Sequence, residues 1–249
     1  MEQTLQTVNI LGVKITVTNV RQALELLDTH REDWRGRYVC ACNVHTTVMA
    51  HDDPAFCAAE NGAAMVVADG GPLSVVQRSR GFADAGHVTG SDLMAGLFAR
   101  SAERGYRHFF YGSTEQTQSL LFEKLTAQYP GIQIAGGEAS VFRPLTEAEN
   151  DALLARINAA QPDYVWIGLG APRQELFMAQ NAGRVHALML GVGGGFDVFA
   201  GNVQRAPAWM QKCCLEWLFR LLQEPKRLFK RYFVTNTRFL WLLWKERGK

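Results

Sequence analysis

Residues 164–169 read Tyr-Val-Trp-Ile-Gly-Leu and residues 187–192 read Ala-Leu-Met-Leu-Gly-Val, two short runs without a charged side chain. A strand that is apolar on both faces belongs in the middle of a parallel sheet that helices cover on both sides. Tyr38–Asn43 and Ala64–Ala68 are further apolar runs, and Arg107–Tyr111 is another predicted strand. These runs predict a largely parallel sheet.

Amphipathic stretches with apolar residues at helical spacing lie between these runs. Two of them open on capping boxes, Ser113-Thr-Glu-Gln116 before a helix to Gln128 and Thr146-Glu-Ala-Glu149 before a helix to Ala159. Right-handed crossovers between parallel strands place such helices on both faces of a sheet. We therefore predict an α/β fold, a doubly wound, mostly parallel sheet with flanking helices plus a helical C-terminal appendage.

Charge and aromatic residues are distributed unevenly along the chain. Residues 204–249 contain 11 Lys and Arg and 3 Asp and Glu, a net charge of +8, whereas the remaining 15 basic and 21 acidic residues give −6. Four of the six tryptophans also fall in this last stretch: Trp209, Trp217, Trp241 and Trp244. We therefore predict two domains, an α/β core over residues 1–203 and a basic, aromatic-rich appendage over residues 204–249.

The N-terminal residues and the cysteines indicate in which cellular compartment the protein is expected. Residues 1–9 have neither a basic segment nor an apolar run, so we expect no secretory signal. No stretch reaches the roughly 18–20 apolar residues that span a bilayer. The five cysteines lack the paired spacing of a zinc site, and we interpret them as reduced thiols. We expect a cytoplasmic protein.

Polar and glycine-rich segments follow four of the predicted strands. Ligands of an open parallel sheet bind beyond the carboxyl ends of its strands. The four segments are Asn43-Val-His45-Thr46, Asp69-Gly-Gly71, the stretch from Gly168 to Glu175 and the stretch from Gly191 to Asp197. Their convergence at one edge of the sheet predicts a ligand site there.

Asp69 follows an apolar strand and precedes two glycines, which places its carboxylate at the edge of the sheet beside exposed backbone. Such an aspartate can act as a general base. The alternative is an aspartate in a turn or a helix cap, because Asp-Gly is a common turn pair.

The glycines of residues 191–195 let backbone N–H groups approach a ligand such as a diphosphate. A tight structural turn is the alternative. The segment is not the dinucleotide fingerprint, because Phe196 stands at the third glycine position.

A helix is predicted to begin at Arg173, after Pro172. The N-terminus of this helix can accept an anion. Glu175 has the alternative interpretation of a favourable acid in the first turn.

Asn43 and His45 can hydrogen-bond hydroxyl groups, although a lone histidine is more often structural. The chain contains no Asp-x-Asp motif and no Cys/His cluster. The sequence therefore predicts no bound metal and no cofactor.

In combination these segments resemble the WecG/TagA/CpsF family of bacterial glycosyltransferases. The resemblance rests on five core segments and two C-terminal ones, and it covers nearly the whole chain in order. The segments are Ala68-Asp-Gly70, Val88-Thr-Gly-Ser-Asp-Leu93, Gly170-Ala-Pro-Arg-Gln-Glu175, Gly191-Val-Gly-Gly-Gly-Phe-Asp-Val198, Ala200-Gly-Asn-Val203, Arg205-Ala-Pro207 and Leu215 to Arg227. The Asn43-Val-His45 segment looks closest to the branch that builds xanthan-type or acetan-type exopolysaccharides.

The resemblance implies transfer of a sugar from a UDP-sugar to a polyprenyl-diphosphate-linked saccharide, with inversion and without a metal. It implies that Asp69 is the base, that Asn43 and Gln174 line the sugar pocket, and that arginines of the tail reach the diphosphate. The catalytic candidates are Asp69, Gln174, Arg220 and Arg227. The substrate-binding candidates are Asn43, His45, His87, Arg173, Gly193, Gly194, Asp197, Lys230 and Arg231.

Two positions depart from the family pattern. His87 stands where the family usually has arginine, and a neutral imidazole binds an anion less well than a guanidinium does. Lys230 replaces a second usual arginine, with Arg231 beside it. Either of these two can supply the charge, though with different geometry.

The tail alternates Trp, Phe and Leu with Lys and Arg, a pattern that suits a helix lying in the headgroup region of an anionic membrane. We therefore expect peripheral attachment to the inner face of the cell membrane. The alternative is a helix docked on the core or in the interface of a homo-oligomer. Nucleic acid is not expected as a partner, because the tail carries no recognised nucleic-acid motif and the core is acidic.

The family resemblance thus implies transfer of glucose, N-acetylmannosamine or its uronic acid in the synthesis of bacterial exopolysaccharide or cell-surface polysaccharide. The main alternative is a module that binds a nucleotide-sugar without catalysis and docks on membrane enzymes. A nicotinamide-dependent oxidoreductase is disfavoured by the missing third glycine.

Overall fold

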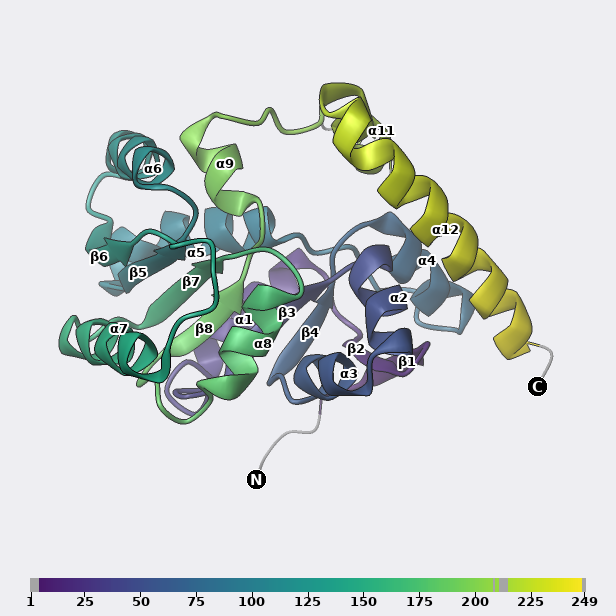
Figure 1. Ribbon diagram of the computed structural model, residues 1–249, viewed down its shortest axis with the longest axis horizontal. Coiled ribbons are helices and arrows are strands. Elements are labelled where there is room, and N and C mark those ends of the chain that lie inside the picture. Colours follow the sequence, from purple (N-terminus) through teal and green to yellow (C-terminus); the bar gives the residue numbers. More distant parts are fainter. Residues whose placement is uncertain (1–4, 208, 211–214, 248–249) are drawn as a thin grey trace. The chain divides into compact units, whose positions relative to one another are not determined.

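The computed structural model describes residues 5–207, 209–210 and 215–247 (Figure 1). The chain divides into two compact units. We call Arg21–Cys40 with Gly90–Gln204 the sheet unit, and Met1–Val20, Ala41–Thr89 and Arg205–Lys249 the tail unit.

Six strands hydrogen-bond in the order β4-β3-β8-β7-β5-β6, and β3 contributes residues to both units. The strands are β3 (Tyr38–Cys42), β4 (Met65–Ala68), β5 (Arg107–Gly112), β6 (Gln133–Glu138), β7 (Tyr164–Gly168) and β8 (Leu188–Gly191). The pairs β3/β8, β8/β7, β7/β5 and β5/β6 are all parallel. The predicted mostly parallel α/β sheet is confirmed.

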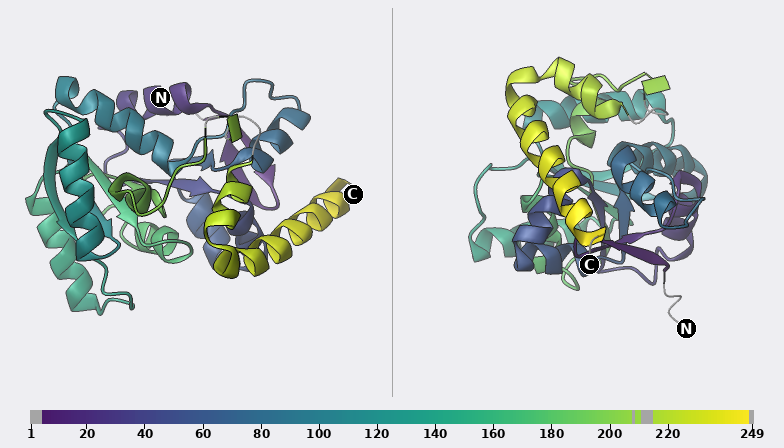
Figure 2. Two further views of the ribbon diagram at one scale, coloured as in Figure 1. Left: turned by 90° about the horizontal axis from the view of Figure 1, so that it is seen from above. Right: turned by 90° about the vertical axis from the view of Figure 1, so that its right-hand side faces the viewer.

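The helices of the sheet unit flank its strands (Figure 2). They are α1 (Val20–Thr29), α5 (Gly90–Arg104), α6 (Glu115–Gln128), α7 (Glu147–Ala159), α8 (Arg173–Gln180) and α9 (Gly195–Ala200). The capping box of Thr146 and Glu149 at the start of α7 is confirmed. The predicted cap of α6 is wrong by one residue: Thr114 caps it, because Thr114 is extended whereas Ser113 has a φ of 57°.

The tail unit begins with an antiparallel hairpin of β1 (Thr7–Ile10) and β2 (Val13–Thr16). Its helices are α2 (Val44–Asp52), α3 (Pro54–Asn61), α4 (Gly71–Ser79), α11 (Glu216–Gln223) and α12 (Pro225–Arg247). The predicted helical C-terminal region is thus present. Within this unit α12 lies along α2, and its Leu228, Phe239 and Leu242 are buried (Figure 1).

One unit boundary, between Gln204 and Arg205, falls beside the domain boundary predicted at residue 203. Residues 205–249, however, form a compact unit with the hairpin and with residues 41–89. The functional division into a catalytic core and a membrane-docking appendage stays a prediction.

His108 on β5 lies at the centre of the aromatic core of the sheet unit and is fully buried. The Ser101 hydroxyl donates to the Leu97 carbonyl and lies 2.5 Å from Nε2 of His108, so this nitrogen carries the proton. Nδ1 accepts from the indole N–H of Trp166 at 3.1 Å. Both ring nitrogens of the neutral imidazole are therefore satisfied, and burial lowers the pKa of His108 from 6.5 to about 3.

We expect the free energy of unfolding to fall steeply as the pH drops below neutrality. His108 takes up a proton near pH 6.5 in the unfolded chain but only near pH 3 in the folded one, so acid favours the unfolded state. Its share of the loss between pH 7 and pH 5 should be about 2 kcal/mol.

Urea unfolding of the wild type and of His108→Gln at both pH values measures this share. Gln keeps an acceptor for Trp166 but does not titrate in this range. Equal pH dependence in the two proteins would contradict the prediction.

Candidate active site

The carboxyl ends of β3 and β4 lie side by side in the tail unit. The backbone N–H of Asp69 donates to the carbonyl of Cys42 at 2.7 Å, which places the residue after β4 beside the last residue of β3. Asn43 follows Cys42 and caps α2, and its Oδ1 accepts from the N–H groups of His45 and Thr46. The structure thus brings together Asn43, His45 and Asp69, as their positions after neighbouring strands predict.

Asp69 is half-buried and stands one residue before the N-cap position of the next helix, α4. Gly70 occupies the N-cap position of α4 and makes no side-chain cap bond. Its φ of 101° lies in the left-handed region that favours glycine, so the turn after Asp69 depends on this residue. The N-cap position of α4 thus belongs to Gly70, and Asp69 stands in the turn before it.

His87 lies on a segment that returns to the same edge. The N–H of Val88 donates to the carbonyl of Ala68 at 2.8 Å, so the residue after His87 is fixed beside the last residue of β4. His87 itself is half-buried. The tail unit therefore holds four of the predicted site residues, Asn43, His45, Asp69 and His87, at the ends of two strands.

The sheet unit holds a second group, at the carboxyl ends of β7 and β8. These strands are paired in register up to Ile167 and Gly191. Gln174, in the first turn of α8, is only 4% exposed, and its Oε1 accepts from the N–H of Gly193 at 3.0 Å. Its Nε2 donates to Oε1 of Glu175 at 2.7 Å. Both ends of the Gln174 amide are thus bound to the protein.

Glu175 differs from what the sequence suggests for a first-turn acid. Its side chain is 1% exposed, and Oε2 is buried without a hydrogen-bond partner among the described residues. Burial raises the pKa of Glu175, while the hydrogen bond from Gln174 lowers it to a smaller extent. Glu175 does stand in the first turn of α8, as the alternative interpretation has it, but its carboxyl group is buried in the interior.

The other predicted residues of the sheet unit lie near this group. Arg173 is exposed, and its Nη2 donates to the carbonyl of Leu169 at 3.2 Å. Gly194 is exposed and precedes α9. Asp197 in α9 accepts from Nδ2 of Asn202 at 3.1 Å, so part of its hydrogen-bonding capacity orders the segment after the helix.

The predicted cationic residues of the tail lie on α11 and α12. Arg220 on α11 is half-buried, and Lys230 on α12 is exposed. Arg227 and Arg231 belong to α12, but their side chains lie outside the described residues. The edge of Trp217 meets the ring of Tyr232 at 6.2 Å between centroids, which joins α11 to α12.

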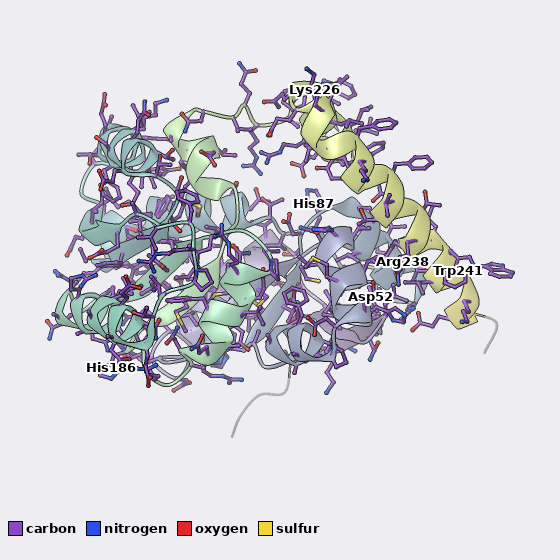
Figure 3. All side chains as sticks on the ribbon, in the orientation of Figure 1. Asp52, His87, His186, Lys226, Arg238 and Trp241 are labelled. Atoms are coloured by element: carbon purple, nitrogen blue, oxygen red, sulfur yellow. The ribbon has the colours of Figure 1, made fainter. Side chains whose placement is uncertain are left out.

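The face of α12 opposite to its buried side chains carries large apolar groups. Trp244 is 73% exposed and Trp241 is 53% exposed. Figure 3 shows Trp241 pointing away from α2, while Arg238 on the same helix is paired with Asp52 of α2 at 2.5 Å. The ammonium group of Lys245 lies 5.3 Å from the centre of the Trp241 ring. The helix is therefore docked on one face and aromatic and basic on the other.

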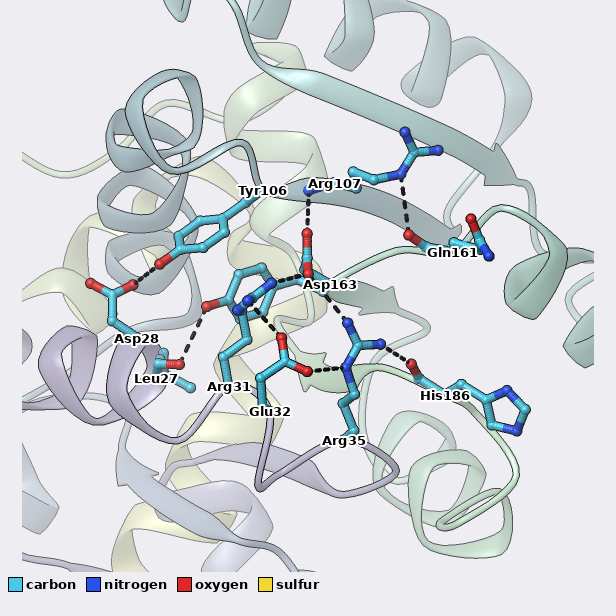
Figure 4. Close-up of polar contacts among 11 residues, drawn as sticks. Leu27, Asp28, Arg31, Glu32, Arg35, Tyr106, Arg107, Gln161, Asp163 and His186 are labelled. Atoms are coloured by element: carbon cyan, nitrogen blue, oxygen red, sulfur yellow. Dashed lines mark hydrogen bonds and ion pairs between the residues drawn. The ribbon is translucent and has the colours of Figure 1, made fainter.

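A separate polar network lies at the amino ends of β5 and β7 (Figure 4). Asp163 accepts from the N–H of Arg107 at 2.8 Å, and Arg35 donates to the carbonyl of His186 at 2.7 Å. The cavity of about 540 Å³ beside it is lined by Arg35, Arg107, Asn158, Gln161, Asp163 and His186. These groups bond mainly to one another, and ligands of this fold bind at the opposite strand ends, so we interpret the network as structural.

Within the described part of the chain, no three His, Cys, Asp or Glu side chains gather as a metal site would require. No helix in that part combines the length and the apolar character needed to cross a bilayer.

Comparison with known proteins identifies a family and a relative. The family model described as Glycosyl transferase WecG/TagA/CpsF family matches residues 8–249. A protein of Bacillus spizizenii (strain ATCC 23059 / NRRL B-14472 / W23), the N-acetylglucosaminyldiphosphoundecaprenol N-acetyl-beta-D-mannosaminyltransferase, is 30% identical over 200 residues. The match covers 80% of this chain and 76% of that protein.

Proposed function

The chain belongs to the WecG/TagA/CpsF family of glycosyltransferases, and from this premise we propose that it transfers a hexosyl group from a UDP-sugar to a polyprenyl-diphosphate-linked saccharide. The Bacillus relative supports the acceptor class, because its name describes a transferase that acts on a sugar joined to diphosphoundecaprenol. The proposed product belongs to exopolysaccharide or cell-surface polysaccharide synthesis. The candidate sugars are glucose, N-acetylmannosamine and its uronic acid.

One observation carries the catalytic part of the proposal. Asp69 stands at the carboxyl end of β4, fixed by the hydrogen bond of its N–H to Cys42 and followed by the tight turn at Gly70. A carboxylate held there can take the proton of an acceptor hydroxyl as that oxygen attacks the anomeric carbon. The bond from this carbon to the UDP oxygen breaks, and the configuration inverts. Asn43 and His45, beside Asp69, are proposed to contact sugar hydroxyls.

The leaving diphosphate needs positive charge or hydrogen-bond donors as it departs. We assign this role to Arg220 and Arg227 of the tail, with support from Lys230 or Arg231. In the sheet unit, the glycines from Gly191 to Gly195, Arg173 and Asp197 are proposed to bind the donor. The proposed mechanism requires no metal.

A panel of UDP-sugars tested against polyprenyl-diphosphate mono- and disaccharides checks the function. Release of UDP that depends on both donor and acceptor, with an inverted linkage in the product, is the expected result. Binding of UDP-sugars without turnover across the panel would favour the alternative, a non-catalytic module that docks on membrane enzymes.

We further propose that the exposed face of α12 attaches the enzyme to the inner face of the cell membrane. Trp241, Trp244, Phe229 and Phe233 lie exposed on a helix that also carries several Lys and Arg residues. Aromatic rings beside basic side chains suit the headgroup region of an anionic leaflet.

The double variant Trp241→Ser/Trp244→Ser should bind vesicles containing an anionic phospholipid at least about tenfold more weakly than the wild type. Co-sedimentation with vesicles at low and high salt measures the effect, and high salt should weaken binding of the wild type. Val75→Ser, a change at an exposed apolar residue of α4, serves as the control. Unchanged vesicle binding of the double variant would contradict the proposal.

A further inference from the structure

Gln174 and Glu175 form a buried polar pair at the start of α8 in the sheet unit. Both side chains are at least 95% buried, and both are joined to the glycine segment after β8 through one amide. The family premise assigns no role to Glu175, and its position in the interior excludes that of a solvated first-turn acid. Burying a carboxyl group costs free energy, so the buried position of Glu175 requires a physical reason.

The hydrogen bonds fix the orientation of the Gln174 amide. The N–H of Gly193 can only donate, so it requires the oxygen of the amide, and the amide nitrogen is then turned to Glu175. A flipped amide would place two donors against each other at Gly193. Glu175 is therefore the acceptor that holds the amide with its oxygen toward Gly193.

The neighbouring residues leave little room for another arrangement. A Cβ atom at Gly191 would lie 3.2 Å from Nε2 of Gln174 and 2.7 Å from the terminal carbon of Met178. Gly193 has a φ of 52°, a conformation in which its N–H is held by the Gln174 oxygen. The conformation of the glycine segment thus depends on a buried amide that depends in turn on Glu175.

We propose that Glu175 is a positioning residue for donor binding, which acts through Gln174 to fix Gly193 and the segment from Gly191 to Gly195. This inference rests on the proposed function only in that the segment binds the donor. The raised pKa of Glu175 is consistent with it, because a neutral carboxyl can remain buried and still accept through Oε1.

The test compares Glu175→Leu with Glu175→Gln. Gln retains an oxygen that can accept from Gln174, whereas Leu fills a similar volume without an acceptor. In Glu175→Leu the Gly193 amide should exchange with solvent at least about tenfold faster than in the wild type, and the KM for the donor should rise about tenfold. In Glu175→Gln both quantities should stay within about threefold of the wild type, and the KM for the acceptor should be unchanged in both variants.

Met178→Leu is the matched control, because it changes packing in the same helix but keeps the Gln174–Glu175 pair. Wild-type exchange of Gly193 in a folded Glu175→Leu, or an equal loss in Glu175→Gln, would overturn the inference. If Glu175→Leu does not fold, hydrogen exchange of the Gln174 side-chain amide is measured in the wild type instead. Exchange as fast as in a free glutamine would overturn the inference. Amide exchange is measured without substrate, so an inactive wild type would refute the proposed function and leave this inference testable.

Discussion

Replacing Asp69 by asparagine should reduce kcat for sugar transfer by about 10²–10⁴ while leaving the affinity for UDP within about threefold. Asparagine has nearly the shape of aspartate, so it can occupy the half-buried position after β4, but its amide cannot take a proton. Because the surrounding turn is fixed by backbone contacts at Cys42 and Gly70, the variant should fold as the wild type does.

The same substitution elsewhere in the tail unit provides the control. Asp53 caps α3 by accepting from the N–H groups of Ala55 and Phe56, and asparagine caps helices equally well. Asp53→Asn should therefore keep full activity. Full turnover of Asp69→Asn would remove this carboxylate from the mechanism, and a joint loss of UDP binding and of thermal stability would assign Asp69 a structural role instead.

Much of the sheet could be predicted because its central strands are apolar on both faces. The runs at residues 164–169 and 187–192 became β7 and β8, and the residues that follow neighbouring strands do lie side by side, as the bond between Asp69 and Cys42 shows. This part of the prediction depends only on strand direction, which hydropathy and crossover rules determine.

Helix α2 was missed because its nine residues, Val-His-Thr-Thr-Val-Met-Ala-His-Asp, do not separate apolar and polar faces. The available signal was local: Asn43 followed three residues later by Thr46 forms a reciprocal cap, a variant of the usual capping box. Asn43 was therefore predicted as a ligand contact, whereas the structure also gives its Oδ1 a capping role.

Strand β6 contains Gly136 and Gly137, which the sequence gives no reason to place in a strand. The structure supplies the reason, because a Cβ atom at Gly136 would lie 2.8 Å from the ring of Phe109 and one at Gly137 would lie 2.5 Å from the ring of Phe122. The burial of Glu175 was not predicted, for a similar reason. Its burial depends on packing at β7 and β8, and helical position alone does not reveal this.

The second large effect is expected from the tail. A chain ending at Gln204 should lose at least about 10² in turnover even with a water-soluble acceptor, for which membrane attachment is irrelevant. Truncation removes Arg220, proposed to meet the charge of the diphosphate. It also removes α12, which packs against α2. Since the N-cap of α2, Asn43, lies beside Asp69, the truncated protein loses support for the predicted site as well as charge.

Two point variants separate these causes within the intact chain. Arg220→Gln on α11 should lower kcat by about 10²–10³. Arg238→Gln on α12 also removes one positive charge, together with one exposed ion pair to Asp52, and it should change kcat by less than about twofold. Thermal unfolding should show both variants folded. If Arg220→Gln retained wild-type turnover while the truncated chain did not, the tail would act by supporting α2. If the truncated chain itself kept its rate with the soluble acceptor, the tail would serve attachment alone, since neither its charge nor its packing would then be needed for sugar transfer.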